Sequence, residues 1–376
     1  MNSKDSRLIV PFSNFAAAHA ENQDKVESAV LRVMNSGRYI MGRELDAFEE
    51  ELADWLGVGT IVGVGNGTDA LAISFLAMGV KPGDEIITTD MTALPTIAAI
   101  QQVGAVPIPI DINAATGLLD ANGIENALTS RTRGIVPVHL YGRSCDMTTV
   151  VKTASEHGLW VVEDCAQAIG ARHSGRVVGT FGVLGAFSFY PTKNLGAYGD
   201  AGAVLCQDEG LAERIRALRN YGQARHKGQT ERGVNSRLDE IQAAVLRAKL
   251  PHLQGWLTRR RVLAGRYREG LPSAILPARH TNEEHVYHLF PVLVPNRNRF
   301  RDHLRNTGVE TMIHYPSPVH RQAVMGKLAD DGFPAANRWS AEVLSLPLHP
   351  FLSDESVDFI IESVISVMEA MPCPPL

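Results

Sequence analysis

Two residues of complementary chemistry each follow a short apolar stretch of this chain. Lys193 comes shortly after residues 184–189, and Asp164 follows residues 159–162. Apolar stretches of this length predict buried strands. A lysine amine at such a place can form a Schiff base with an aldehyde, and an aspartate can pair with a protonated ring nitrogen. The two residues therefore suit pyridoxal phosphate (PLP), and Ser188 adds a hydroxyl that can bind its phosphate.

A glycine-rich turn that opens a helix is the third feature. Gly65, Gly67 and Thr68 follow the apolar residues 60–64, and apolar side chains recur at helical spacing over residues 71–78. Glycines let the backbone approach an anion, the threonine supplies a hydroxyl, and the helix dipole favours phosphate at the N-terminus. Each feature alone has a plainer interpretation, a capped helix after a tight turn or a solvated surface lysine. Their combination favours a phosphate-bearing cofactor.

The composition narrows the class of protein. The chain has 376 residues, a hydrophobic fraction of 45% and a net charge of −5, which describe a globular protein without a general nucleic-acid surface. The four cysteines show neither metal-ligand spacing nor a disulfide pattern, so we expect no metal site. The first residues have no apolar signal-peptide core, and no apolar run is long enough to span a membrane. We therefore expect a cytoplasmic enzyme.

The order of apolar and helical stretches predicts an α/β fold. Strands are predicted at residues 85–88, 106–110, 134–138, 159–163, 184–190 and 203–206. Helical stretches lie between most of them, which is typical of a mostly parallel sheet covered on both faces. Ligands of such sheets bind outside the carboxyl ends of the strands, where Asp164 and Lys193 are expected.

The length exceeds that of a single typical core, so we expect two domains. A large domain is predicted over residues 1–250 and a smaller domain over residues 251–376. The remaining predicted elements are helices at 238–250 and 256–271, a strand at 286–294, a helix around 299–306, a strand at 312–315, two late helices, and a polar surface loop over 317–337.

Several motifs in this order carry a family resemblance. They are residues 37–42 with 48–49, and then 66–71, 82–85, 137–142, 163–168, 187–202, 235–244 and 314–316. With them, the chain resembles the DegT/DnrJ/EryC1/StrS aminotransferases, which are PLP-dependent sugar aminotransferases of fold type I. The resemblance implies an aspartate aminotransferase-like fold, with a mostly parallel seven-stranded sheet in the large domain and a smaller α+β C-terminal domain.

The resemblance also implies roles for single residues. Lys193 and Asp164 would be catalytic, as the Schiff-base lysine and the partner of the ring nitrogen. The implied cofactor-binding residues are Gly67, Thr68, Gln167, Ser188, Lys193 and Asn235. Gln167 could instead bond to backbone in a loop, and Asn235 could be a turn residue before a helix. If Asn235 reaches the phosphate of the partner chain, the enzyme is a homodimer with shared active sites, and Arg237 supports the same loop or the interface.

The substrate is less well defined by the sequence. Residues that border the substrate cleft in relatives are Tyr39, Tyr221, His314 and Tyr315. Motifs at 233–240 and 313–320 resemble members that act on nucleotide-linked 3-keto hexoses, so the expected reaction transfers an amino group from L-glutamate to a keto sugar nucleotide. A basic run could attract its pyrophosphate or form a solvated helix face: Arg214, Arg216, Arg219, Arg225, His226 and Lys227.

Two other functions remain open at this point. The first is a PLP-dependent sugar dehydratase or lyase. Family dehydratases can have histidine in place of the lysine, and Lys193 argues against that type of enzyme here. A regulatory protein that kept the fold without turnover is the third interpretation. One departure from the family pattern is Ala93, which stands where many relatives have an aromatic residue that stacks on the cofactor ring.

Overall fold

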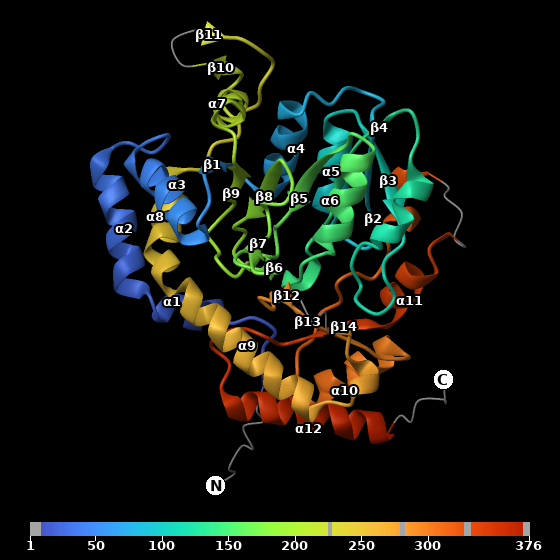
Figure 1. The fold of residues 1–376 in the computed structure, drawn as a ribbon. Helices are drawn as coiled ribbons and strands as arrows, with labels where there is room; N and C mark the ends of the chain where they lie inside the picture. Colours follow the sequence, from blue (N-terminus) through green and yellow to red (C-terminus); the bar gives the residue numbers. More distant parts are fainter. Residues whose placement is uncertain (1–8, 225–227, 279–282, 327–331, 371–376) are drawn as a thin grey trace.

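A seven-stranded sheet forms the centre of the chain (Figure 1). The computed structural model describes residues 9–224, 228–278, 283–326 and 332–370. Strand order in the sheet is β1-β9-β8-β5-β4-β2-β3. The strands are β1 (Thr60–Val64), β2 (Glu85–Thr89), β3 (Val106–Ile110), β4 (Thr132–Val136), β5 (Trp160–Asp164), β8 (Leu184–Ser188) and β9 (Gly202–Cys206).

The sheet is mostly parallel, as predicted. Only β9 runs antiparallel to its neighbours, β1 and β8, and the other adjacent pairs in this described sheet are parallel. Strands β1, β2, β5 and β8 therefore end at the same edge of the sheet. The side chains that follow these ends are brought together although they are distant in the sequence.

Alternate residues of the strands pack on opposite faces of the sheet. On one face, Ile61 and Phe187 join a core with α3 (Arg43–Leu56) and α8 (Glu240–Lys249). On the other face, Val62 and Ala186 join a core with α4 and α5. The remaining helices of this part are α1 (Phe15–Ala20), α2 (Gln23–Ser36), α4 (Gly67–Ala77), α5 (Leu94–Gln102), α6 (Met147–Glu156) and α7 (Glu209–Leu218).

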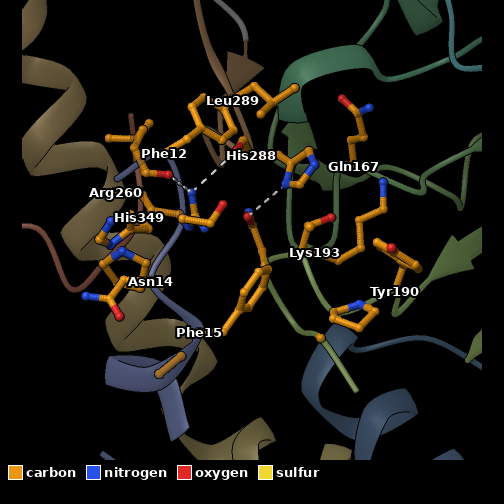
Figure 2. Close-up of a pocket in the computed structure, with 18 of the residues that line it drawn as sticks. Phe12, Asn14, Phe15, Gln167, Tyr190, Lys193, Arg260, His288, Leu289 and His349 are labelled. Atoms are coloured by element: carbon orange, nitrogen blue, oxygen red, sulfur yellow. Dashed lines mark hydrogen bonds between the residues drawn. The ribbon is translucent and has the colours of Figure 1, made fainter. Parts of the chain in front are cut away.

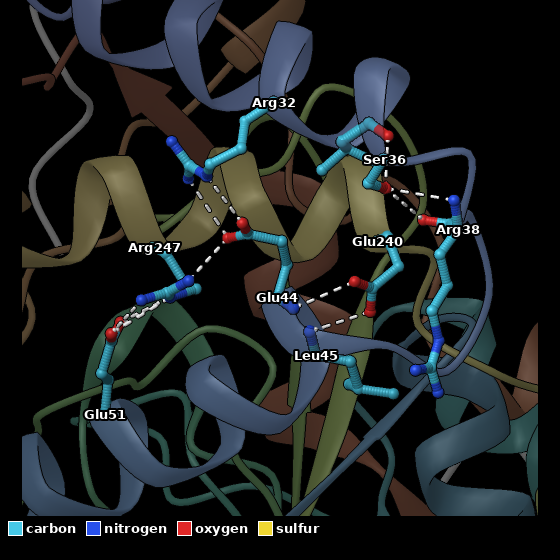
Figure 3. Close-up of polar contacts among 9 residues, drawn as sticks. Arg32, Ser36, Arg38, Glu44, Leu45, Glu51, Glu240 and Arg247 are labelled. Carbon is cyan, nitrogen blue, oxygen red and sulfur yellow. Dashed lines mark hydrogen bonds and ion pairs between the residues drawn. The ribbon is translucent and has the colours of Figure 1, made fainter.

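A buried carboxylate joins α8 to the start of α3 (Figure 3). Glu240 accepts hydrogen bonds from the backbone N–H groups of Gly42, Glu44 and Leu45, at 2.8, 2.9 and 3.0 Å. These are donors that a helix N-terminus leaves unpaired, so the carboxylate caps α3 from another element. An ion-pair chain beside it comprises Arg32, Glu44, Arg247 and Glu51. Together these contacts fix the position of α8 and of the chain that leads into it.

The C-terminal part has its own core, built around α9 (Leu253–Gly270). Leu263 and Tyr267 of this helix pack with the other elements there, whereas Leu253 and Leu257 pack in the core beside the large sheet. Because α9 contributes to both cores, the division at residue 250 stays a prediction. The other elements are α10 (Arg297–Thr307), α11 (Pro334–Glu342), α12 (Asp354–Ala370), and the paired strands β13 (Phe290–Leu293) and β14 (Val343–Leu346).

Three short strand pairings lie outside the seven-stranded sheet and the β13–β14 pair. Strand β6 (Arg172–His173) pairs with β7 (Arg176–Val177) and with β12 (Glu283–Glu284). Strands β10 (Gln223–Ala224) and β11 (Gly228–Gln229) pair beyond α7, at the top of Figure 1, where they project from the rest of the chain.

Two local predictions differ from the structure. The strand predicted at 312–315 is an extended segment with one bridge, between Met312 and Ser345. The surface loop predicted over 317–337 is wrong in part, because Val319 and His320 are buried and α11 begins at Pro334. His320 lies 2.6 Å from the buried carboxylate of Asp90, a distant partner that the local polar pattern could not indicate. Residues 327–331 of that loop lie outside the described part.

Candidate active site

Two cavities meet at Lys193. The first, called the strand-end cavity, has a volume of about 600 Å³ and lies at the carboxyl ends of the parallel strands. The second, called the α9 cavity, has a volume of about 370 Å³ and is lined by α9 and by segments of the C-terminal part. Gln167, Tyr190 and Lys193 line both. A reactant in the α9 cavity can therefore meet a group held in the strand-end cavity at the lysine amine.

One end of the strand-end cavity is built to receive an anion. Gly67 and Thr68 are the first residues of α4, and the side chain of Asn66 caps this helix by accepting from the Asp69 backbone N–H at 2.8 Å. A Cβ on Gly67 would lie 2.6 Å from Cβ of Ser188, so only glycine fits there. The backbone N–H groups of the first turn of α4 and the hydroxyls of Thr68 and Ser188 can all donate hydrogen bonds to a phosphate.

The same cavity is lined by Asp164, a residue that is 5% exposed. One carboxylate oxygen accepts from the Thr96 hydroxyl at 2.9 Å, and the other accepts from the Ala166 backbone N–H at 3.1 Å. Burial raises the pKa of Asp164, and these two donors and the charge of Lys193 oppose that shift. A cationic group beside the carboxylate would also oppose the effect of burial on the pKa of Asp164 and would hold the carboxylate ionised.

A buried network behind the cavity supports Asp164. The backbone N–H of His139 donates to the carbonyl of Asp164 at 3.0 Å, and its Nε2 lies 3.0 Å from the carboxylate of Glu163. Glu163 also accepts from the backbone N–H groups of Gly179 and Gly182, both at 2.7 Å. The end of β5 is therefore held from both sides. We did not predict this support from the sequence, although His139 belongs to the motif at 137–142.

Lys193 lies in the turn that follows β8, where its backbone N–H donates to the carbonyl of Tyr190 at 2.8 Å. The side chain is half-buried. Burial lowers the pKa of Lys193 to about 8, and the charge of Asp164 opposes that shift. The neutral amine, which is the form that attacks an aldehyde, is thus accessible near neutral pH.

Three further predicted residues line the α9 cavity. Gln167 accepts from the backbone N–H of Tyr141 at 2.7 Å and donates to the hydroxyl of Tyr315 at 3.1 Å. Gln167 therefore both bonds to the backbone and lines the site. Nδ1 of His314 lies 2.9 Å from the hydroxyl of Ser345, and burial together with the charge of Lys193 lowers the pKa of His314 to about 4.

Three predicted site residues do not line either cavity of their own chain. Tyr39 is 51% exposed and Tyr221 is 43% exposed, with the guanidinium of Arg237 5.4 Å from the Tyr221 ring centroid. Asn235 is also exposed and forms an isolated bridge with Asn220. A role for these three residues in the site requires a second chain.

Tyr190 is the aromatic residue in the described lining of the strand-end cavity. Ala93 occupies the N-cap position of α5 without a side-chain hydrogen bond and lines the cavity, as do Leu71, Pro95 and Val138. Sequence reasoning missed Thr96, which holds Asp164, although it lies in the same segment as Ala93. A threonine in the first turn of a helix after a strand was the available signal.

The predicted basic run is neutralised where it is described. Arg214 pairs with Glu231, Arg216 with Glu209 and Glu213, and the buried Arg219 with Glu49. These pairs disfavour the interpretation in which the run attracts a pyrophosphate. Residues 225–227, which complete the run, lie outside the described part.

The strand-end cavity fits PLP on three counts. Its lining has an amide and hydroxyl cradle that a Cβ at residue 67 would fill, a buried carboxylate, and an amine of lowered pKa that also lines the α9 cavity. On the mostly parallel sheet found here, these features define a PLP-dependent enzyme of fold type I.

Comparison with known proteins identifies the family. The DegT/DnrJ/EryC1/StrS aminotransferase family profile matches residues 20–365, and the chain belongs to this family. It is 46% identical to the erythromycin biosynthesis sensory transduction protein EryC1 of Saccharopolyspora erythraea, over 95% of this chain and 99% of that protein. It is 42% identical to the dTDP-3-amino-3,4,6-trideoxy-alpha-D-glucose transaminase of Streptomyces venezuelae, over 97% of each.

The fold agrees with these relatives. The crystal structure of DesV from S. venezuelae superimposes with a TM-score of 0.93 at 41% identity, and covers 97% of this chain and 100% of that one. The protein is a PLP-dependent sugar aminotransferase, which confirms the predicted family, fold class and cofactor. No helix in the described residues is both long and apolar enough to cross a lipid bilayer.

Proposed function

We propose that this enzyme transfers the amino group of L-glutamate to the ketone of a nucleotide-linked hexose, at C3 of a 6-deoxy sugar. The observation that carries the proposal is the position of Lys193, which lines both cavities and lies between a PLP-shaped site and a second, polar and aromatic site. Relatives whose names specify transamination of a dTDP-linked 3-amino sugar support the choice of acceptor.

The residues divide the work as follows. Lys193 would hold the cofactor covalently and, once released, carry a proton between the two carbons that exchange the amino group. Asp164 would keep the ring nitrogen protonated, and Gly67, Thr68 and Ser188 would anchor the phosphate. Bound PLP supplies the electron sink that stabilises negative charge on the reacting carbon.

The proposal includes a homodimer with shared sites. Asn235 is exposed and lies outside the cavities of its own chain, and it follows the segment that projects beyond α7 (Figure 1). A second chain that packs against this segment would receive Asn235 at its phosphate site. Tyr39 and Tyr221, which also lie outside their own cavities, would border the same shared cleft.

A half-reaction screen tests the proposed substrates. The PLP-loaded enzyme is mixed with L-glutamate, and conversion of the cofactor to its amine form is followed by absorbance. Candidate keto sugar nucleotides are then added, and the one that restores the original spectrum is the acceptor. A sugar dehydratase would convert the sugar without consuming glutamate, and this result would exclude the proposed function.

The Lys193→Ala variant gives the matched test of the lysine. We expect it to keep the fold but to lose both transamination and the cofactor adduct that borohydride traps in the wild type. A trapped adduct on another lysine would exclude the assignment.

A further inference from the structure

The α9 cavity contains a buried cation that pairs with no carboxylate of the described residues. Arg260 of α9 is 6% exposed, and its Nη1 donates to the carbonyls of Leu348 and Tyr287 at 2.7 and 3.0 Å. Its Nε and Nη2 make no hydrogen bond, and no carboxylate pairs with it, within the described residues. Burial lowers the pKa of Arg260 to about 9, so the side chain is still charged at neutral pH. An uncompensated buried charge is costly unless an anion binds to it.

A histidine without partners lies beside this arginine. His349 is 8% exposed, and neither of its ring nitrogens has a hydrogen-bond partner among the described residues. Burial and the charge of Arg260 lower the pKa of His349 to about 4, so the ring is neutral at pH 7 and offers one N–H donor. Both side chains line the α9 cavity.

The two side chains face Lys193 across the cavity. Figure 2 shows Arg260 and His349 on one side and Lys193 on the other, with His288 between them. Burial, together with the charges of Lys193 and Arg260, lowers the pKa of His288, whose side chain lines the same cavity. A donor whose amine reacts at Lys193 and that reaches across the cavity would present its far end to Arg260, and an anionic group there would pair with the guanidinium.

The Lys and Arg residues in the described lining of this cavity, Lys193, Lys249 and Arg260, face no acidic residue of that lining. Lys249 donates to the carbonyl of Gly196 at 2.7 Å, and no aspartate or glutamate is among the described residues that line the cavity. Polar donors and positive charge without an opposing carboxylate favour an anionic ligand.

We propose that Arg260 and His349 bind the side-chain carboxylate of the amino donor and so select a dicarboxylic amino acid. This inference rests on the proposed function, because it takes Lys193 as the reacting end. One guanidinium charge and one neutral N–H donor match a single carboxylate. The pyrophosphate of the acceptor carries more charge and is flanked by bulky groups on both sides. It suits the mouth of a cavity better than these two nearly buried side chains.

The test separates binding from turnover. Calorimetry of the PLP-loaded enzyme measures the affinity for glutarate, a dicarboxylate without an amine, and for thymidine diphosphate. We compare the wild type with two variants. His349→Leu breaks no side-chain hydrogen bond among the described residues, and Arg260→Lys keeps the charge but loses the planar fork. Arg261→Lys is the matched control, because Arg261 is the next residue of α9, does not line the cavity and donates to the carbonyl of His285.

We expect each of the two cavity variants to weaken glutarate binding by about tenfold to a hundredfold, the range for one charge-assisted hydrogen bond. Their preference for L-glutamate over L-2-aminobutyrate in the half-reaction should fall by a similar factor. Affinity for thymidine diphosphate should be unchanged, and Arg261→Lys should behave as the wild type.

Two results would overturn the inference. One is equal glutarate affinity in all four proteins while glutamate reacts normally. The other is loss of thymidine diphosphate binding in the cavity variants, which would assign the pocket to the acceptor. If the wild type does not react with L-glutamate but binds glutarate through these residues, the proposed donor is wrong. The assignment of Arg260 and His349 as a carboxylate-binding site is then still supported.

Discussion

Replacement of Asp164 with asparagine separates the charge of this residue from its shape. The amide can keep both local contacts of the carboxylate. Its oxygen can accept from the Ala166 N–H, and its NH₂ can donate to the Thr96 hydroxyl. The Thr96 hydroxyl can then donate to the hydroxyl of Thr92, which lies 2.9 Å away. We therefore expect the variant to fold and to bind PLP. What it loses is the negative charge beside the protonated ring nitrogen.

The size of the loss follows from that charge. Two unit charges about 4 Å apart at an effective dielectric constant of about 20 attract by about 4 kcal/mol. If the transition state requires this attraction, the rate falls by about a thousandfold. Rapid mixing of the loaded enzyme with L-glutamate measures the rate of the half-reaction, and the absorbance of the bound cofactor reports loading.

The matched control is Thr96→Ser, which keeps the hydroxyl that donates to Asp164. We expect its rate to stay within a few-fold of the wild type. Near-normal turnover of a fully loaded Asp164→Asn enzyme would show that the carboxylate is only a structural cap at the end of β5.

Three further predictions follow from the geometry of the site. Gly67→Ala places a Cβ 2.6 Å from Cβ of Ser188 and should weaken PLP binding, measured by equilibrium dialysis, by at least about tenfold. The control Gly255→Ala, whose Cβ meets open space in α9, should leave PLP affinity unchanged. Mixed dimers of Asn235→Ala and Lys193→Ala chains should regain activity above either parent, because one site then receives both intact residues. In the cofactor-free protein, the lowered pKa of Lys193, about 8 against 10.5, means that the unfolded state binds more protons between these values. The free energy of unfolding of the wild type therefore decreases as pH falls through that window. At pH 7, Lys193→Met should have a free energy of unfolding higher than that of the wild type by at most about 3 kcal/mol, measured by urea unfolding, and this difference should shrink as pH rises toward 10.5.

Each of these predictions has a clear contrary result. Equal PLP affinity in the two glycine variants would show that the turn adjusts around a methyl group. Absence of complementation, with subunit exchange confirmed, would place Asn235 outside a shared site. A stability difference between Lys193→Met and the wild type that does not change with pH would show that the amine is solvated in the folded protein.

The sequence by itself determined the local chemistry of the strand-end site. Lys193, Asp164 and the turn at Gly67 each adjoin a short strand, and strand ends can be recognised from apolar runs and the breakers that follow them. The same periodic pattern predicted the mostly parallel sheet, because strands alternating with helices have few other ways to bury their apolar faces. These features depend on neighbours in the chain.

Only the tertiary structure decided which distant side chains meet. Thr96 hydrogen-bonds to Asp164, Glu240 caps α3, and Glu49 neutralises Arg219, yet each pair is far apart in the sequence. A hydrogen bond or ion pair depends on a few ångströms of separation, and no local pattern encodes the packing that sets it.

The uncompensated cation in the α9 cavity was hidden from the sequence for the same reason. Arg260 lies in a basic helical stretch in which arginine is normally solvated, and His349 lies near the start of a loop. Folding brings both side chains to the wall of a cavity that Lys193 also lines and whose described lining contains no aspartate or glutamate. The sequence predicted where the cofactor would bind, whereas the packing of α9 against the C-terminal core decided that Arg260 and His349 lie in the cavity beside that site.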